Sequence, residues 1–172
     1  ALTLTVLYWW FASRCTIGVM SPDCNPSRII DGAILGEHMY AQGSRGHDPE
    51  GLVAIGGAFV TAAAGTTAGH IALAARGRSS TVARQALLRL CTWTVVCAML
   101  GTLFALIVEP FKRLWTPGFG LLTAALGLLI FTVVFSVIDV QSSRRGAARR
   151  FDRLTWPLVA LGRNSLLVYF GS

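Results

Sequence analysis

Three long runs without Asp, Glu, Lys or Arg limit the folds open to this chain more than any other feature. They cover Leu52–Ala75, Leu90–Val108 and Gly118–Ile138, and His70 is the one ionisable histidine inside them. At helical rise, a run of about 24 residues extends roughly 36 Å, enough to cross the hydrocarbon core of a bilayer. The sequence therefore predicts an all-α fold, a polytopic transmembrane helical bundle.

The composition agrees with this class. Charged residues make up 13% of the chain, against about 25% in a soluble domain, and the mean hydropathy is +0.59. The short alternating segments of a membrane β-barrel are not visible. We expect one domain with about five helices or part-helices and one long loop over 14–50. The expected helices cover 1–13, 51–75, 82–108, 118–140 and 154–172.

The two end segments differ from the other three. Residues 1–13 reach only about 20 Å as a helix, less than a bilayer core of about 30 Å. We therefore expect 1–13 to be the outer end of a helix that begins upstream, within further N-terminal helices of the same protein. Residues 154–172 stop without a polar tail.

The formal net charge of +7 is concentrated in two connections between the runs. Their arginines are Arg76, Arg78, Arg84 and Arg89, then Arg144, Arg145, Arg149, Arg150 and Arg153. Both connections lie on one side if every run spans once, which is the positive-inside pattern and makes the 14–50 loop extracytoplasmic. No aromatic residues interleave the basic clusters, so nucleic acid is not an expected partner.

Two cysteines lie in the long loop. Cys15 and Cys24 are separated by eight residues, and on an oxidising side such a pair can close a small disulfide ring. Two free thiols are the alternative. No CxxC spacing or matching histidine pair accompanies them, so no metal site is expected.

The stretch Asp48-Pro49-Glu50-Gly51 marks the change from polar loop to apolar helix. Asp48 can cap the helix, Pro49 suits its first position, and Glu50 complements the helix dipole. A cap alone explains this order as well as a site role does. Upstream, 26–40 has the apolar spacing of a short surface helix, on which Asp31 and Glu37 are expected to face water or a substrate.

Small residues recur within the first run. Gly57, Thr61, Gly65 and Gly69 follow at intervals of four, a spacing that lets neighbouring helices approach closely in lipid. Helix packing explains this ridge, and a slot for a slender ligand is the sharper alternative. His70 is expected to reach toward the cytoplasmic surface.

Two other places carry polar residues of interest. Lys112 and Trp115 lie in a short turn bracketed by prolines, which is expected at the extracytoplasmic interface. Arg163 and Asn164 lie inside an apolar segment, where polar residues are costly and mark a site by default; snorkelling explains Arg163 nearly as well.

The chain resembles the C-terminal half of the heparan-α-glucosaminide N-acetyltransferase family of polytopic acyltransferases, which has many bacterial members. The residues that carry the resemblance occur in the right order with compatible spacing. They are Cys15 and Cys24, Ile30-Asp31, Leu35-Gly36, Asp48-Pro49-Glu50-Gly51, Lys112 with Leu114-Trp115, Ile138-Asp139-Val140, and Gly162 with Asn164-Ser165 and Val168-Tyr169.

The resemblance implies transfer of an acetyl group from cytoplasmic acetyl-CoA, the donor substrate, to an extracytoplasmic amino sugar or other glycan. The family's acetyl-accepting histidine lies upstream of Ala1, so no catalytic residue is expected in this fragment. Asp48, Glu50, Lys112, Trp115 and Asn164 are then substrate-binding or supporting residues. His70, where the animal enzyme has lysine, and Arg163, where the family often has an apolar residue, are donor-side candidates.

Two other functions fit the residues alone: a transporter or flippase-like module without covalent chemistry, and a structural subunit. Expected partners are membrane lipid, the glycan acceptor, the N-terminal helices of the same protein and, as one option, a second copy of the chain. The preference for arginine over lysine suggests a GC-rich bacterium, so the expected location is a bacterial inner membrane.

Overall fold

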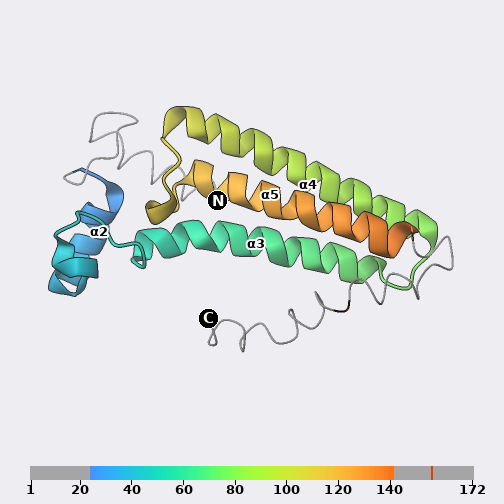
Figure 1. The fold of residues 1–172 in the computed structure, drawn as a ribbon, viewed down its shortest axis with the longest axis horizontal. Helices are drawn as coiled ribbons and strands as arrows, with labels where there is room; N and C mark the ends of the chain where they lie inside the picture. The colour runs from blue at the N-terminus through green and yellow to red at the C-terminus, as the bar shows by residue number, and fades with distance from the viewer. Residues whose placement is uncertain (1–23, 142–155, 157–172) are drawn as a thin grey trace.

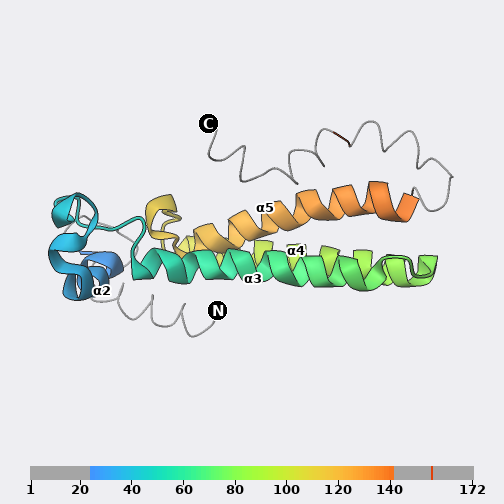
Figure 2. The ribbon, with the colours of Figure 1, turned by 90° about the horizontal axis from the view of Figure 1, so that it is seen from below.

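The structure is a computed structural model that describes residues 24–141 and Trp156. Within these residues it contains helices and turns and no strand. Three long helices form a bundle: α3 (Leu52–Ala75), α4 (Ser80–Ile107) and α5 (Pro117–Phe135). Figure 1 shows α5 between α3 and α4, and Figure 2 shows it inclined to both.

All three helices are long and apolar enough to cross a membrane, and little of each is buried inside the protein. Large apolar side chains point outward along the bundle; Leu106 is 81% exposed and Phe59 is 69% exposed. Outward apolar faces would be costly in water and are favourable in lipid. The all-α prediction is therefore confirmed for the part of the chain that the structure describes, and three of its helices could span a membrane.

The sequence at each helix end explains where the long helices start and stop. The residue after α3 is Arg76, and Gly77 follows with φ +68°, a conformation that breaks the helix. Pro110 follows α4 closely, and Pro117 occupies the first turn of α5, where a missing N–H costs nothing. A π-helical turn, η4 (Ser136–Gln141), continues α5.

Small residues let the helices approach, but only along part of the predicted ridge. A Cβ on Gly57 would overlap the carbonyl oxygen and Cβ of Trp115, and Gly120 lies beside the Gly57 carbonyl oxygen. Gly65 and Gly69 have no atom of a neighbouring element within 4 Å of the place where a Cβ would lie. Close packing is thus confirmed at Gly57, while Gly65 and Gly69 face open space.

A smaller unit lies beyond the N-terminal end of α3 (Figure 1). It consists of α2 (Pro26–Leu35) and two short 3₁₀ turns, η1 (Gly36–His38) and η2 (Tyr40–Gly43). The predicted 26–40 helix is shorter than expected, since Gly36 takes φ +53° and ends it. This unit and the α4–α5 connection lie at one end of the bundle, named the α2 end; the α3–α4 connection lies at the other, named the arginine end.

Several predictions concern residues outside the described part. These are the helices over 1–13 and 154–172, the basic linker before the latter, and the residues Cys15, Arg163 and Asn164.

Candidate functional site

Asp31 of α2 is the most enclosed charged residue at the α2 end. Its exposure is 0%, and its Oδ2 accepts a hydrogen bond of 2.5 Å from the Ser27 hydroxyl. Its Oδ1 accepts a longer bond, 3.4 Å, from the backbone N–H of Val53 in the first turn of α3. A carboxylate at this place complements the positive end of the α3 dipole. The expectation that Asp31 faces water or a substrate is wrong, because α2 packs it against α3.

Gly51 makes this contact sterically feasible. It is the residue immediately before α3, and a Cβ there would overlap the Asp31 carboxylate. The expectation that Asp48 caps α3, with Pro49 as its first helical residue, is therefore wrong. The helix starts at Leu52. Asp48 accepts the N–H of Glu50 in the turn before it, and the Asp31 carboxylate of α2 accepts the N–H of Val53 in the first turn of α3.

Asp48 instead holds the loop before α3 in shape. It is 6% exposed; its Oδ1 accepts the Glu50 N–H at 2.9 Å and its Oδ2 accepts the Tyr40 N–H at 3.0 Å. Its own N–H donates to the Ser27 hydroxyl at 2.9 Å. Ser27 therefore bridges the two carboxylate residues, accepting from one and donating to the other.

Asn25 ties the same loop to the start of α2. Its side-chain oxygen accepts the Arg28 N–H at 2.9 Å, which caps α2, and its amide donates to the Gly46 carbonyl oxygen at 2.7 Å. Next to it, Cys24 is disulfide-bonded; its expected partner, Cys15, lies outside the described residues. The loop that carries Asp48 is thus fixed to α2 at several points.

His47 has the one buried side-chain nitrogen or oxygen without a hydrogen bond in the part that the structure describes. That atom is Nε2; Nδ1 lies 3.0 Å from the Arg45 carbonyl oxygen. A carbonyl oxygen only accepts, so Nδ1 is the donor in this contact. The ring meets the edge of Phe111, with centroids 6.1 Å apart. Sequence reasoning gave no role to His47 or to Ser27; adjacency to the Asp48 turn was the only signal for His47.

The α4–α5 connection completes the α2 end. Its short turn η3 (Lys112–Leu114) is followed by Trp115 with φ 46° and ψ 48°, a left-handed conformation unusual for tryptophan. Two contacts hold this residue: its backbone against Gly57, and its ring edge-to-face with Phe119 at 5.5 Å. Thr116, which is fully buried, accepts the Phe111 N–H at 2.9 Å and closes the turn.

Glu50 and Lys112 are two of the charged residues at this end. Both are exposed, and neither forms an ion pair with another described residue. The structure thus gathers four predicted residues, Asp48, Glu50, Lys112 and Trp115, at the α2 end. His70 is exposed on α3, far along the helix toward the arginine end.

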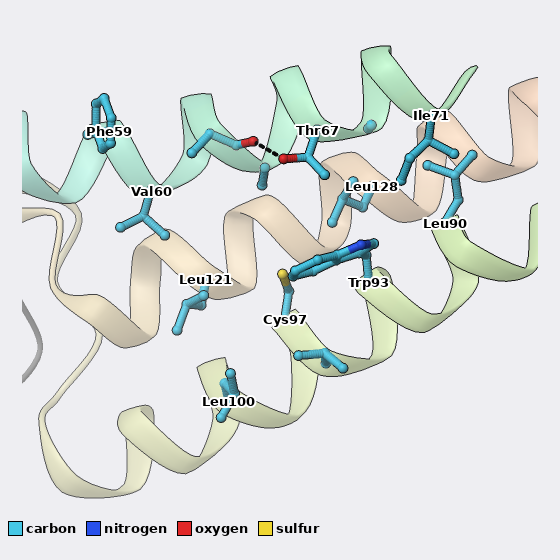
Figure 3. Close-up of a pocket in the computed structure, with 14 residues that line it drawn as sticks. Phe59, Val60, Thr67, Ile71, Leu90, Trp93, Cys97, Leu100, Leu121 and Leu128 are labelled. Carbon is cyan, nitrogen blue, oxygen red and sulfur yellow. Dashed lines mark hydrogen bonds between the residues drawn. The ribbon is translucent and has the colours of Figure 1, made fainter. Parts of the chain in front are cut away.

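A different feature lies within the bundle. Figure 3 shows a groove of about 330 Å³ between α3, α4 and α5, lined by apolar side chains together with Trp93, Cys97 and Thr67. The Thr67 hydroxyl already donates to the Ala63 carbonyl oxygen at 2.8 Å. No charged residue lines the groove, so it can hold hydrocarbon but supplies no acid, base or anion site. A second groove, of about 250 Å³, runs along Gly65 and Gly127, where the slot for a slender ligand was predicted.

No group of three or more His, Cys, Asp or Glu side chains suited to a metal ion occurs among the described residues. No protein-family model, curated protein or solved structure matches the chain. The family resemblance therefore rests on the motif residues of the sequence alone.

Proposed function

We propose that this chain is part of a membrane-bound acyltransferase that moves an acetyl group from cytoplasmic acetyl-CoA to an amino sugar or glycan on the other side. The α2 end is the acceptor side in this proposal. The arginine end faces the cytoplasm, as the positive-inside rule favours.

One observation carries the proposal: motif residues far apart in the sequence meet at the α2 end. Asp31 touches the Gly51 backbone, and Trp115 touches Gly57, six residues further along α3. These contacts join the Ile30-Asp31, Asp48–Gly51 and Lys112–Trp115 pieces of the resemblance in one assembly. Residues that only pack within lipid have no need of such a polar assembly at the bundle end.

The reaction sets what the acceptor side must provide. In the scheme that the resemblance implies, the upstream histidine takes the acetyl group from the thioester, which breaks the C–S bond. The acceptor amine then attacks the acetyl carbon, and a C–N bond to the acceptor forms as the bond to the histidine breaks. The amine loses a proton, and coenzyme A leaves as a thiolate that takes up a proton. The acceptor must therefore be held with its amine toward the bundle, and a carboxylate suits an amino sugar because it accepts charge-assisted hydrogen bonds.

Glu50 fits that role best. Its backbone N–H is fixed by Asp48, while its side chain is exposed and free of an ion pair among described residues. Asp31 and Asp48, whose oxygens are already used, keep the turn rigid. Lys112 and Trp115 lie at the same end of the bundle.

The test uses proteoliposomes that contain the protein, with labelled acetyl-CoA on one side and glucosamine on the other. Acetylated glucosamine should accumulate on the acceptor side. Glu50→Gln should lower kcat/KM for glucosamine about ten- to a hundredfold, the value of a hydrogen bond to a charged group. Glu37→Gln is the matched control, because Glu37 is an exposed carboxylate at the same end; it should leave transfer unchanged.

The alternatives give different results. Uptake of glucosamine without acetylation would favour a transporter. Equal acetyl transfer by Glu50→Gln and the wild type would be compatible with the acyltransferase proposal but would refute the role of Glu50 in acceptor binding.

A further inference from the structure

We propose that Arg76, Arg78, Arg84 and Arg89 bind the phosphate groups of anionic phospholipids at the arginine end. Arg76 and Arg78 lie in the α3–α4 connection, and Arg84 and Arg89 lie on the first part of α4. All four side chains are exposed. This proposal stands apart from the acyltransferase proposal and does not depend on it.

The four arginines have no protein carboxylate to neutralise them. No Asp or Glu occurs in the sequence between Glu50 and Glu109, and none of the four arginines forms an ion pair within the part that the structure describes. The α2 end differs, because acidic residues accompany its basic ones. Its described basic residues are Arg28, Arg45, Lys112 and Arg113, and its acidic ones are Asp31, Glu37, Asp48, Glu50 and Glu109.

The depth of the arginines matches that of lipid phosphates. The uncharged stretch Leu90–Ile107 of α4 extends about 27 Å at helical rise, close to the thickness of a bilayer core. Arg89 therefore stands at the edge of the hydrocarbon, and Arg84 lies roughly 7.5 Å further out along the helix. Arg76, the residue after α3, lies at the same end of the bundle.

The neighbours of Arg84 and Arg89 on α4 point to a lipid rather than a soluble anion. Residues four apart share a helix face, and the later one lies deeper in the bilayer here. Leu88, four after Arg84, is 60% exposed, and Trp93, four after Arg89, is 48% exposed. Each arginine thus has an exposed apolar partner below it that can contact an acyl chain while the guanidinium binds the phosphate. Tryptophan is also enriched at this depth.

The test measures lipid binding to the purified protein in detergent. Phosphatidylglycerol and phosphatidylcholine are titrated separately, with binding followed by native mass spectrometry. Phosphatidylglycerol should bind more tightly, and Arg84→Gln with Arg89→Gln should weaken it about twenty-fivefold, or about fivefold per arginine. The matched control, Lys112→Gln with Arg113→Gln at the α2 end, should leave binding within about twofold.

Three further results decide the proposal. Raising the salt concentration should weaken phosphatidylglycerol binding in the wild type, a readout that needs no variant. If the glutamine variant does not fold, Arg84→Lys with Arg89→Lys is tested instead, because it keeps the charge. This lysine variant should retain most of the affinity for phosphatidylglycerol. A loss of affinity in the lysine variant would indicate that bidentate arginine contacts dominate binding at this site. Equal binding of the two lipids, or displacement of phosphatidylglycerol by equimolar inorganic phosphate or coenzyme A, would overturn the assignment to lipid.

Discussion

Gly51→Ala gives the sharpest test of how the α2 end is built. Gly51 has φ −72°, a value that alanine adopts without strain, so backbone entropy alone should stabilise the variant by about 0.4–1 kcal/mol. The added Cβ overlaps the Asp31 carboxylate, however, and Asp31 is fully buried with its oxygens bonded to Ser27 and Val53. Overpacking costs about 1–3 kcal/mol, and losing a hydrogen bond to a charged group costs about 1.5–3 kcal/mol. We therefore expect a net destabilisation of about 2–5 kcal/mol.

Unfolding in mixed micelles, titrated with a denaturing detergent and followed by tryptophan fluorescence, measures this loss. Gly65→Ala is the matched control, because Gly65 lies on the same helix with open space where its Cβ would be; it should be neutral or slightly stabilising. The double variant with Asp31→Ala should be less destabilised than the two single changes added together. Gly51→Ala with wild-type stability would refute the close approach of Asp31 to α3.

The same unfolding assay checks three further changes. Gly57→Ala should cost about 1–3 kcal/mol, since its Cβ meets the Trp115 backbone rather than a flexible side-chain end. Ser27→Ala removes the donor to the buried Asp31 carboxylate and should cost about 2–4 kcal/mol. His47→Phe keeps the aromatic contact with Phe111 and loses only the Nδ1 hydrogen bond, so the free energy of unfolding should fall by less than about 1.5 kcal/mol. A larger fall would mean that Nε2 also accepts a hydrogen bond in the protein as it stands in the membrane.

The three long apolar helices could be predicted from the sequence because a membrane span is recognised from its own residues alone. Each span must be long, apolar and free of charge, whatever its neighbours are, and the runs around 52–75, 90–108 and 118–138 satisfy that rule on their own. The helix breaks at Gly77 and Pro110 are equally local. The ridge of small residues predicted close packing only in part, since the α4–α5 connection approaches α3 at Gly57 and no neighbouring element that the structure describes does so at Gly65.

The polar end could not be predicted in the same way. Asp48-Pro49-Glu50 has the order of a helix start, and a local rule places the cap there. The structure starts α3 later because Asp31, twenty residues before Gly51, occupies the space at its N-terminus. When the capping carboxylate belongs to another element, the sequence near the helix start does not predict it. The only local sign is the glycine, whose missing side chain makes room for the carboxylate.

The interactions that stabilise the long helices differ from those that stabilise the α2 end. Little of each long helix is buried inside the protein, so single apolar changes on the outward faces should be tolerated. The mutual packing of these helices includes close approaches such as that at Gly57. The α2 end depends on hydrogen bonds that Ser27 makes to two carboxylate residues. Since removal of one member leaves another buried group unpaired, the Asp48 turn is rigid only while the whole set is intact. A rigid turn that presents an exposed Glu50 is the arrangement that the proposed acceptor site requires. Ser27→Ala should therefore lower both the free energy of unfolding and acceptor binding, whereas Glu50→Gln should lower acceptor binding alone.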